Sequence, residues 1–494
     1  MVPSNEHGPA ETAARSLRWL PHAGHLTYGF LCRDAVAPAL RGTPADRAAL
    51  VHTVLFTWAC EGMFGCTTDP QGFHSPERGV AARQLVELTI DPGLAPHLPP
   101  HFFVDAAYAF TWLNYWSMQT SEAARLATLL LDYARGHGVP DVASLAQQVD
   151  AGGTGLLLPV DRAVLLHMMV ANAHAYCTGN VAAFAVGHAE GSALFELVCV
   201  SGHKVLQPSM VTFAATMACG VHSPNDPETY LKIYPRLKAL LAQYQDADQM
   251  GQVTAVLQHA CVAALSGQLR LAETLCAPLG AMMQGYSMTK TYWTHAWDGN
   301  FLPPVADMYV MSSLTPWGYV LAMNGRHDEA CAVLQPLVAR QTRRLERGMT
   351  VVQLCDLAAV CLALVAQRSG SCNDAEVLAL VDLAARLWMR GYLLSNSKLS
   401  IGFISGMHVA ALLFLERGDT ARALAVVDEY ERLSNLSPAV RDRHPFHGVC
   451  HYVRGRAAAQ AGRTAEAAAA FARALCALPP EHYLRPACEA ARRD

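Results

Sequence analysis

The clearest structural signal in this chain is residues 448–481, which read GVCHYVRGRAAAQAGRTAEAAAAFARALCALPPE. They predict two helices that fold back on each other at Gly462, because glycine readily adopts the left-handed conformation that ends a helix. Gly455 lacks a Cβ atom and lets the two helices approach closely, with Phe471 as the large side chain between them. Pro479 ends the second helix because it has no N–H to donate.

This pattern of glycine, alanine, aromatic residue and proline resembles a tetratricopeptide repeat, a helical hairpin that stacks on further copies of itself. Similar turns recur upstream, and the last four glycine turns lie 44 to 48 residues apart. Because a standard repeat has roughly 34 residues, we expect longer helices here. The expected upstream turns are Gly418, Gly370, Gly325, Gly267, 223–226, 178–180, 119–121 and 68–70.

The resemblance implies an all-α fold, a right-handed superhelical stack of about nine antiparallel helical hairpins, or α-solenoid. A chain of 494 residues that is 52% hydrophobic suits such a stack, since neighbouring hairpins share one continuous core. The glycine-rich stretch 150–155 predicts a boundary between irregular N-terminal hairpins, residues 1–150, and clearer repeats, residues 151–494. An ordinary alanine-rich helix bundle is the alternative.

Charge argues against two classes of partner. The 37 basic and 41 acidic residues give a net charge of −4, without the continuous basic stripe that direct nucleic-acid binding needs. The longest apolar stretches, such as 402–415, are shorter than the roughly 18 residues of a membrane-spanning helix. We therefore expect neither nucleic acid nor membrane as a partner.

The cysteines bear on the cellular compartment. Fifteen are scattered along the chain without a Cys-x2-Cys pair, and Cys261, Cys276, Cys361 and Cys476 fall on helix faces expected to be buried. Reduced thiols and the absence of an apolar segment at the N-terminus predict an intracellular protein, cytoplasmic or nuclear.

No recognisable catalytic motif is present, so we expect a non-enzymatic protein without a cofactor. An all-helical enzyme remains an alternative, because acid and base residues can come from distant hairpins. The best metal candidate is His447, Cys450 and His451, in which the two histidines share a helix face. A structural role for these side chains is the simpler interpretation, so we expect no metal site.

An aromatic stretch gives one candidate binding surface. The unit between Gly267 and Gly325 is longer than its neighbours, and the surplus falls in 285–304, which contains Tyr292, Trp293 and Trp297. A long aromatic loop can clamp a ligand or peptide, or it can plug the end of a groove.

Aligning the turns gives a second candidate surface, the concave wall formed by the first helix of each hairpin. Its predicted partner-binding residues are Tyr319, Met323, His408, Tyr452, Arg456 and Gln460. Their mixed chemistry predicts a scaffold or adaptor that binds a protein or peptide segment on this surface.

A second resemblance covers residues 45–138. The order 48–52, 58–60, 75–78, 101–116 and 123–126 is similar to the helical regulatory region of fungal zinc-cluster transcription factors. Their DNA-binding cluster, with six closely spaced cysteines, is missing from this chain. The resemblance implies, as an alternative function, a regulatory module of a transcription regulator without its own DNA reader.

Overall fold

The computed structural model describes most of the chain beyond residue 75. The described residues are 76–93, 120–151, 160–206 (without 176, 178 and 179), 208–244 (without 221 and 223–225), 249–284, 306–346, 354–394, 405–436 and 446–492, and the isolated residues 43, 46, 96, 106, 438 and 439. Within them the chain forms eighteen α-helices and no β-strand, which confirms the all-helical prediction. In chain order these are α5 (Pro76–Ile90), α7 (Thr120–Gly136), α8 (Val142–Asp150), α9 (Val160–Ala175), α10 (Val181–Val205), α11 (Pro208–Gly220), α12 (Pro227–Gln243), α13 (Gln249–Leu265), α14 (Leu269–Gln284), α15 (Ala306–Met323), α16 (His327–Glu346), α17 (Cys355–Ser369), α18 (Asp374–Leu394), α19 (Met407–Glu416), α20 (Thr420–Ser434), α21 (Phe446–Gln460), α22 (Thr464–Ala477) and α23 (Arg485–Ala491).

Glycine ends the first helix of the five C-terminal hairpins. The five predicted turn glycines all have a left-handed backbone, with φ between 65° and 75°. The residue after each glycine donates its N–H back to the last turn of the helix; Asp419, for example, bonds the Phe414 carbonyl at 2.9 Å. This pairing satisfies carbonyl groups that a helix end leaves without partners, so each glycine both stops its helix and reverses the chain.

The more N-terminal turns use side-chain caps. Asn180 accepts a hydrogen bond from the Ala183 N–H and begins α10, and Asp226 accepts one from the Thr229 N–H and begins α12. The turn predicted near 119–121 falls at the start of α7, which begins at Thr120, and the residues just before it lie outside the described part of the chain. The turn at 68–70 lies outside the described residues.

The long repeat spacing has two structural sources. Helices α16 and α18 are long, with 20 and 21 residues, as expected. In the last unit the prediction of long helices is wrong, because α20 and α21 have only 15 residues each. There the surplus lies between the end of α20 at Ser434 and the start of α21 at Phe446.

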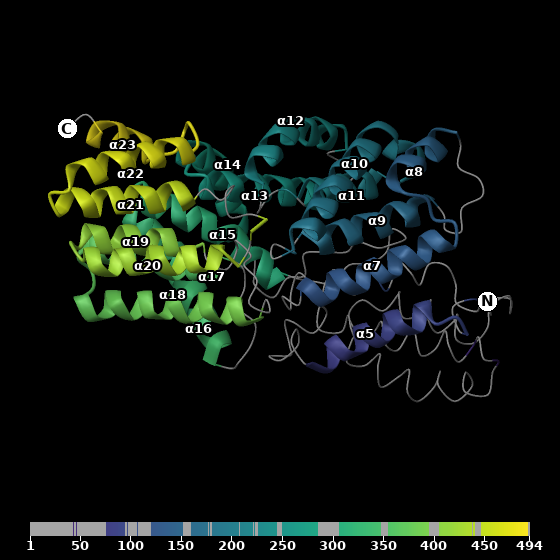
Figure 1. Cartoon of the computed structure of the whole chain (residues 1–494), viewed down its shortest axis with the longest axis horizontal. Coiled ribbons are helices and arrows are strands. Elements are labelled where there is room, and N and C mark those ends of the chain that lie inside the picture. Colours follow the sequence, from purple (N-terminus) through teal and green to yellow (C-terminus); the bar gives the residue numbers. More distant parts are fainter. Residues whose placement is uncertain are drawn as a thin grey trace.

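The helices follow a regular pattern of contacts, which Figure 1 shows along the length of the molecule. Within each of the pairs α9–α10, α11–α12, α13–α14, α15–α16, α17–α18, α19–α20 and α21–α22 the two helices pack together. The first helices also contact one another in an unbroken series, α7, α9, α11, α13, α15, α17, α19 and α21. Helix α8, which ends at the predicted boundary 150–155, packs against α9 and α10, so residues on both sides of that boundary share one core.

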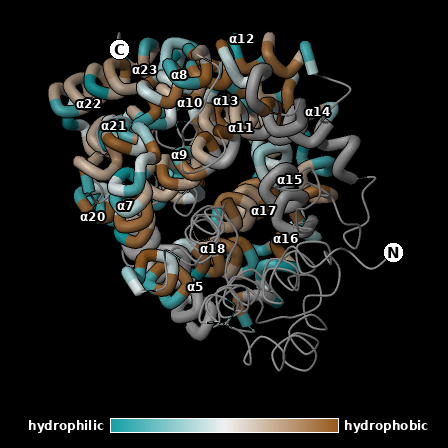
Figure 2. The backbone as a smooth tube through the Cα atoms, turned by 90° about the vertical axis from the view of Figure 1, so that its right-hand side faces the viewer, coloured by the Kyte–Doolittle hydropathy of each residue, from teal (hydrophilic) through white to brown (hydrophobic). Residues whose placement is uncertain are grey.

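Helix α17 is buried over most of its length. All twelve residues from Cys355 to Ala366 are buried, because the helix is enclosed by α15, α16, α18 and α19. Apart from Asp356, the side chains of this stretch are apolar on every side of the helix, as expected for a helix that is buried all round. Figure 2 shows it as a largely hydrophobic tube, while α22, at the edge of the molecule, alternates with hydrophilic residues.

The structure bears on two expectations from the sequence, the absence of a membrane-spanning helix and the burial of the cysteines. One described helix segment, Val181–Gly202 in α10, is long and apolar enough to cross a membrane, but it packs against α8, α9 and α11, and core helices share that composition. The twelve described cysteines are all free thiols; Cys276 and Cys361 are buried as expected and Cys261 is half-buried. Cys476 is exposed, so its predicted burial is wrong.

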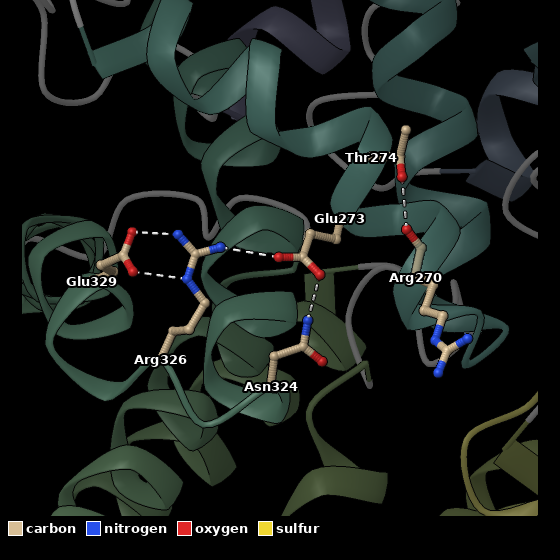
Figure 3. Close-up of polar contacts among 6 residues, drawn as sticks. All are labelled: Arg270, Glu273, Thr274, Asn324, Arg326 and Glu329. Carbon is tan, nitrogen blue, oxygen red and sulfur yellow. Dashed lines mark hydrogen bonds and ion pairs between the residues drawn. The ribbon is translucent and has the colours of Figure 1, made fainter.

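Polar contacts join consecutive hairpins at their glycine turns. Arg326, beside the turn of α15–α16, binds Glu329 through two nitrogens and reaches Glu273 of α14 at 3.0 Å (Figure 3). Asn324 donates to the other oxygen of Glu273 at 2.9 Å. In the next two hairpins, Arg368 of α17 donates through two nitrogens to the carboxylate of Glu416 in α19.

Candidate functional site

The C-terminal segment, residues 481–485, returns to a hairpin far back in the sequence. The N–H of Tyr483 donates to the carbonyl of Gly267, in the α13–α14 turn, at 3.1 Å. The His482 ring fills the space over this glycine: a Cβ atom at Gly267 would lie 2.2 Å from His482 Cδ2. The C-terminal segment therefore lies against the α13–α14 turn. Only glycine fits here, for steric reasons as well as for its φ.

Hydrogen bonds also tie the segment to the end of α22. Arg485 Nη1 donates to the carbonyls of Leu475 and Leu478, both at 2.8 Å. The Leu484 N–H donates to His482 Nδ1 at 3.1 Å, which requires that nitrogen to be unprotonated. Burial, and then the charge of Arg485, lower the pKa of His482 to about 4, so the imidazole is neutral near pH 7.

Tyr483 points its hydroxyl into a buried polar cluster. Its neighbours include Tyr319, Arg368 and Tyr452, and burial raises the pKa of Tyr483. The Tyr319 hydroxyl lies 3.4 Å from His408 Nε2. Burial, with a further contribution from the nearby His482, lowers the pKa of His408 to about 3. Near neutral pH the imidazoles of His408 and His482 are therefore neutral, while Arg368, which also pairs with Glu416 at the surface, carries a positive charge.

The predicted concave wall divides into a covered and an open part. Tyr319, His408 and Tyr452 are buried and gather around the C-terminal segment. Met323 is half-buried, while Arg456 and Gln460 are exposed. The exposed pair is engaged locally: Arg456 donates to the Tyr452 hydroxyl at 3.1 Å, and the Thr420 hydroxyl donates to Gln460 at 2.5 Å.

Sequence reasoning brought these wall residues together but missed what covers them. His482 and Tyr483 follow the two prolines that begin at Pro479, with one residue between, where the last hairpin ends. An aromatic pair after a helix-stopping Pro-Pro was the available signal. The other predicted partner-binding residues, Tyr292, Trp293 and Trp297 in the loop 285–304, lie outside the described residues.

The structure does not assemble the metal candidate in α21 into a ligand cluster. His447 and His451 are half-buried, and the Tyr430 ring lies edge-on to His447 with 5.7 Å between ring centres. Burial raises the pKa of Cys450 strongly, which disfavours the thiolate that binds metals. Among the described residues, the group of three or more potential ligands close enough to share an ion is elsewhere, at His188, His222 and Asp226.

Comparison with known proteins adds no relative. No protein-family model matches the chain, and no curated protein sequence matches it. The resemblances to tetratricopeptide repeats and to the regulatory region of zinc-cluster transcription factors therefore stay predictions. Most of residues 45–138, which carry the second resemblance, lie outside the described residues.

Proposed function

We propose that this protein is a non-enzymatic helical-repeat scaffold, a tetratricopeptide-like α-solenoid that binds a protein segment on its inner wall. The repeated glycine turns and the unbroken series of contacts between first helices support the repeat architecture. A stack of this kind presents one continuous surface, built from one helix of every hairpin, to an extended peptide.

The observation that carries the proposal is the C-terminal segment itself. One main-chain hydrogen bond, from Tyr483 to Gly267, fixes its backbone, and one aromatic side chain enters the cluster around Tyr319. Main-chain pairing combined with a side-chain anchor is the general manner in which proteins hold extended peptides. The segment thus behaves as a peptide ligand that is covalently attached, and the partner we propose is a protein segment with a tyrosine in the same role.

Loosening the segment tests this function. In the full chain, Tyr483→Ala with Arg485→Ala removes the anchor and the tie to α22. A fluorescent synthetic peptide with the sequence of residues 478–488 should then bind in anisotropy measurements. We expect at least tenfold tighter binding than to the wild-type chain, where the site is occupied.

A peptide with alanine in place of the tyrosine should bind the loosened variant at least tenfold more weakly, since buried aromatic anchors dominate such interfaces. Tyr133→Ala, a substitution in the distant helix α7, is the matched control and should leave peptide binding at the wild-type level. If the loosened variant stays folded by circular dichroism and binds neither peptide, the proposed function is wrong.

A further inference from the structure

A second cluster of polar side chains lies in the N-terminal half, remote in sequence from the C-terminal segment. His188 comes from the middle of α10, His222 from the connection between α11 and α12, and Asp226 caps α12. One ring nitrogen from each histidine and one carboxylate oxygen lie within 4.8 Å of one another. All three residues are well buried, with exposed fractions of 9%, 2% and 9%.

The contact between the two imidazoles has a specific geometry. Nδ1 of His188 and Nδ1 of His222 are 3.0 Å apart. At this distance one Nδ1 donates its proton to the other in a hydrogen bond. A metal ion coordinated by both nitrogens would replace that proton. Tetrahedral zinc, with bonds of about 2.0 to 2.1 Å, sets its nitrogen ligands about 3.3 Å apart, so the rings need to separate by only a few tenths of an ångström.

A hydrogen bond already orients the His222 ring in the way that metal-binding histidines are usually oriented. His222 Nε2 lies 3.0 Å from the Ser192 hydroxyl, one helical turn beyond His188 on α10. Metal-binding histidines commonly donate their second ring N–H to an oxygen acceptor of this type, which sets both tautomer and orientation. The Phe184 ring packs on His188 with 4.0 Å between ring centres and restricts its movement.

We propose that His188, His222 and Asp226 form a binding site for one transition-metal ion, of which Zn²⁺ fits the donors best. Two imidazole nitrogens and one carboxylate are a borderline-soft set, unlike the all-oxygen shells that Mg²⁺ and Ca²⁺ prefer. Three protein ligands leave a fourth position for water. The ion would link α10 to the start of α12 and stabilise the fold by mass action.

Metal titration of the full chain tests this site. After treatment with EDTA and removal of the chelator, Co²⁺ serves as the spectroscopic probe and Zn²⁺ as the stabilising ion. We expect one Co²⁺ per chain with visible d–d absorption and without cobalt–thiolate charge-transfer bands. Zn²⁺ should raise the midpoint of thermal unfolding by several degrees.

Three variants separate this site from other histidines and thiols. His188→Gln and Asp226→Asn should each weaken Co²⁺ binding at least tenfold; the second keeps a residue that caps helices well, so it should fold normally. His259→Gln, which changes a buried histidine stacked on Tyr234 outside the cluster, should bind like the wild type. Equal binding by the wild type and both cluster variants, or a thiolate spectrum, would overturn the proposal.

Discussion

The ring of Phe471 in α22 packs directly on the backbone of Gly455 in α21. A Cβ atom at Gly455 would lie 2.7 Å from Phe471 Cε1, which is closer than Cβ atoms in real structures approach non-bonded atoms. The same relationship recurs between Gly318 of α15 and Leu334 of α16, where the added atom would lie 2.4 Å from Leu334 Cδ2. Both pairs have the same separation in sequence, so one packing rule holds two hairpins together.

Alanine at these glycines should destabilise the protein. We expect Gly455→Ala and Gly318→Ala each to lower the free energy of unfolding by about 1 to 3 kcal/mol, because the neighbouring side chain must leave its preferred position. Urea unfolding measures the change. Gly136→Ala in α7 is the matched control, since nothing lies within 4 Å of the added atom. It should be neutral or stabilising by up to about 1 kcal/mol, and an equal loss at all three positions would contradict the packing rule.

Asp356 should make the protein less stable as the pH rises. Burial raises its pKa to about 7, although its carboxylate accepts hydrogen bonds from the Gly406 N–H at 2.7 Å and the Ser405 hydroxyl at 2.9 Å. The folded protein therefore binds a proton more tightly than the unfolded chain does. This contribution to stability is complete below about pH 4 and is lost as the pH rises to about 7, by at most about 4 kcal/mol.

Asp356→Asn removes the titration and keeps one acceptor oxygen. Relative to the wild type, the variant should gain stability between about pH 4 and pH 7, with the difference measured by urea unfolding at several pH values. A pH-independent difference would show that the carboxyl group titrates normally in the folded protein.

His482 should make the protein less stable as the pH falls, which is opposite to the effect of Asp356. Burial lowers the pKa of His482 to about 4, from a usual value of about 6.5, so the folded protein resists protonation at a nitrogen that must accept the Leu484 N–H. This contribution is complete above about pH 6.5 and is lost as the pH falls to about 4, by at most about 3 kcal/mol. His408 lies close by and Arg485 is the adjacent cation.

His482→Asn should reduce this acid sensitivity, because the asparagine oxygen can accept the same N–H without titrating. Thermal unfolding at about pH 7 and about pH 5 provides the comparison. The wild type should lose more stability than the variant on acidification, and identical losses would exclude a role for this histidine.

The ion pairs at the hairpin turns should contribute little stability. Arg326 and Glu273 are each more than a third exposed, so water screens their attraction. We expect Glu273→Gln to lower the free energy of unfolding by less than about 1 kcal/mol, with the difference shrinking in high salt. Urea unfolding at low and high salt measures it. A loss of several kcal/mol would mean that these contacts, and not apolar packing, hold the hairpins together.

Local signals in the sequence predicted the hairpins. Contacts between residues far apart in the sequence could not be predicted. Gly418 and Gly462 stop helices through their own backbone, and Asp226 caps through its own side chain, so short windows of sequence suffice to find them. Tyr319 and His408 could be assigned to one wall by aligning turns. The C-terminal segment that covers them could not be predicted, because the contact between Gly267 and Tyr483 depends on how every hairpin between them is arranged. The approach of His188 to His222 likewise depends on how three helices pack.

Hydrogen exchange at the C-terminal segment tests the central claim most directly. The amide of Tyr483 is bonded to the Gly267 carbonyl, so in the full-length protein it should exchange slowly. A saturating concentration of the synthetic peptide 478–488 should displace the segment and accelerate exchange at Tyr483, and the same peptide with alanine for tyrosine should not. Slow exchange that neither peptide changes would contradict the account, because the segment would then be a fixed part of the core and not an occupant of a binding wall.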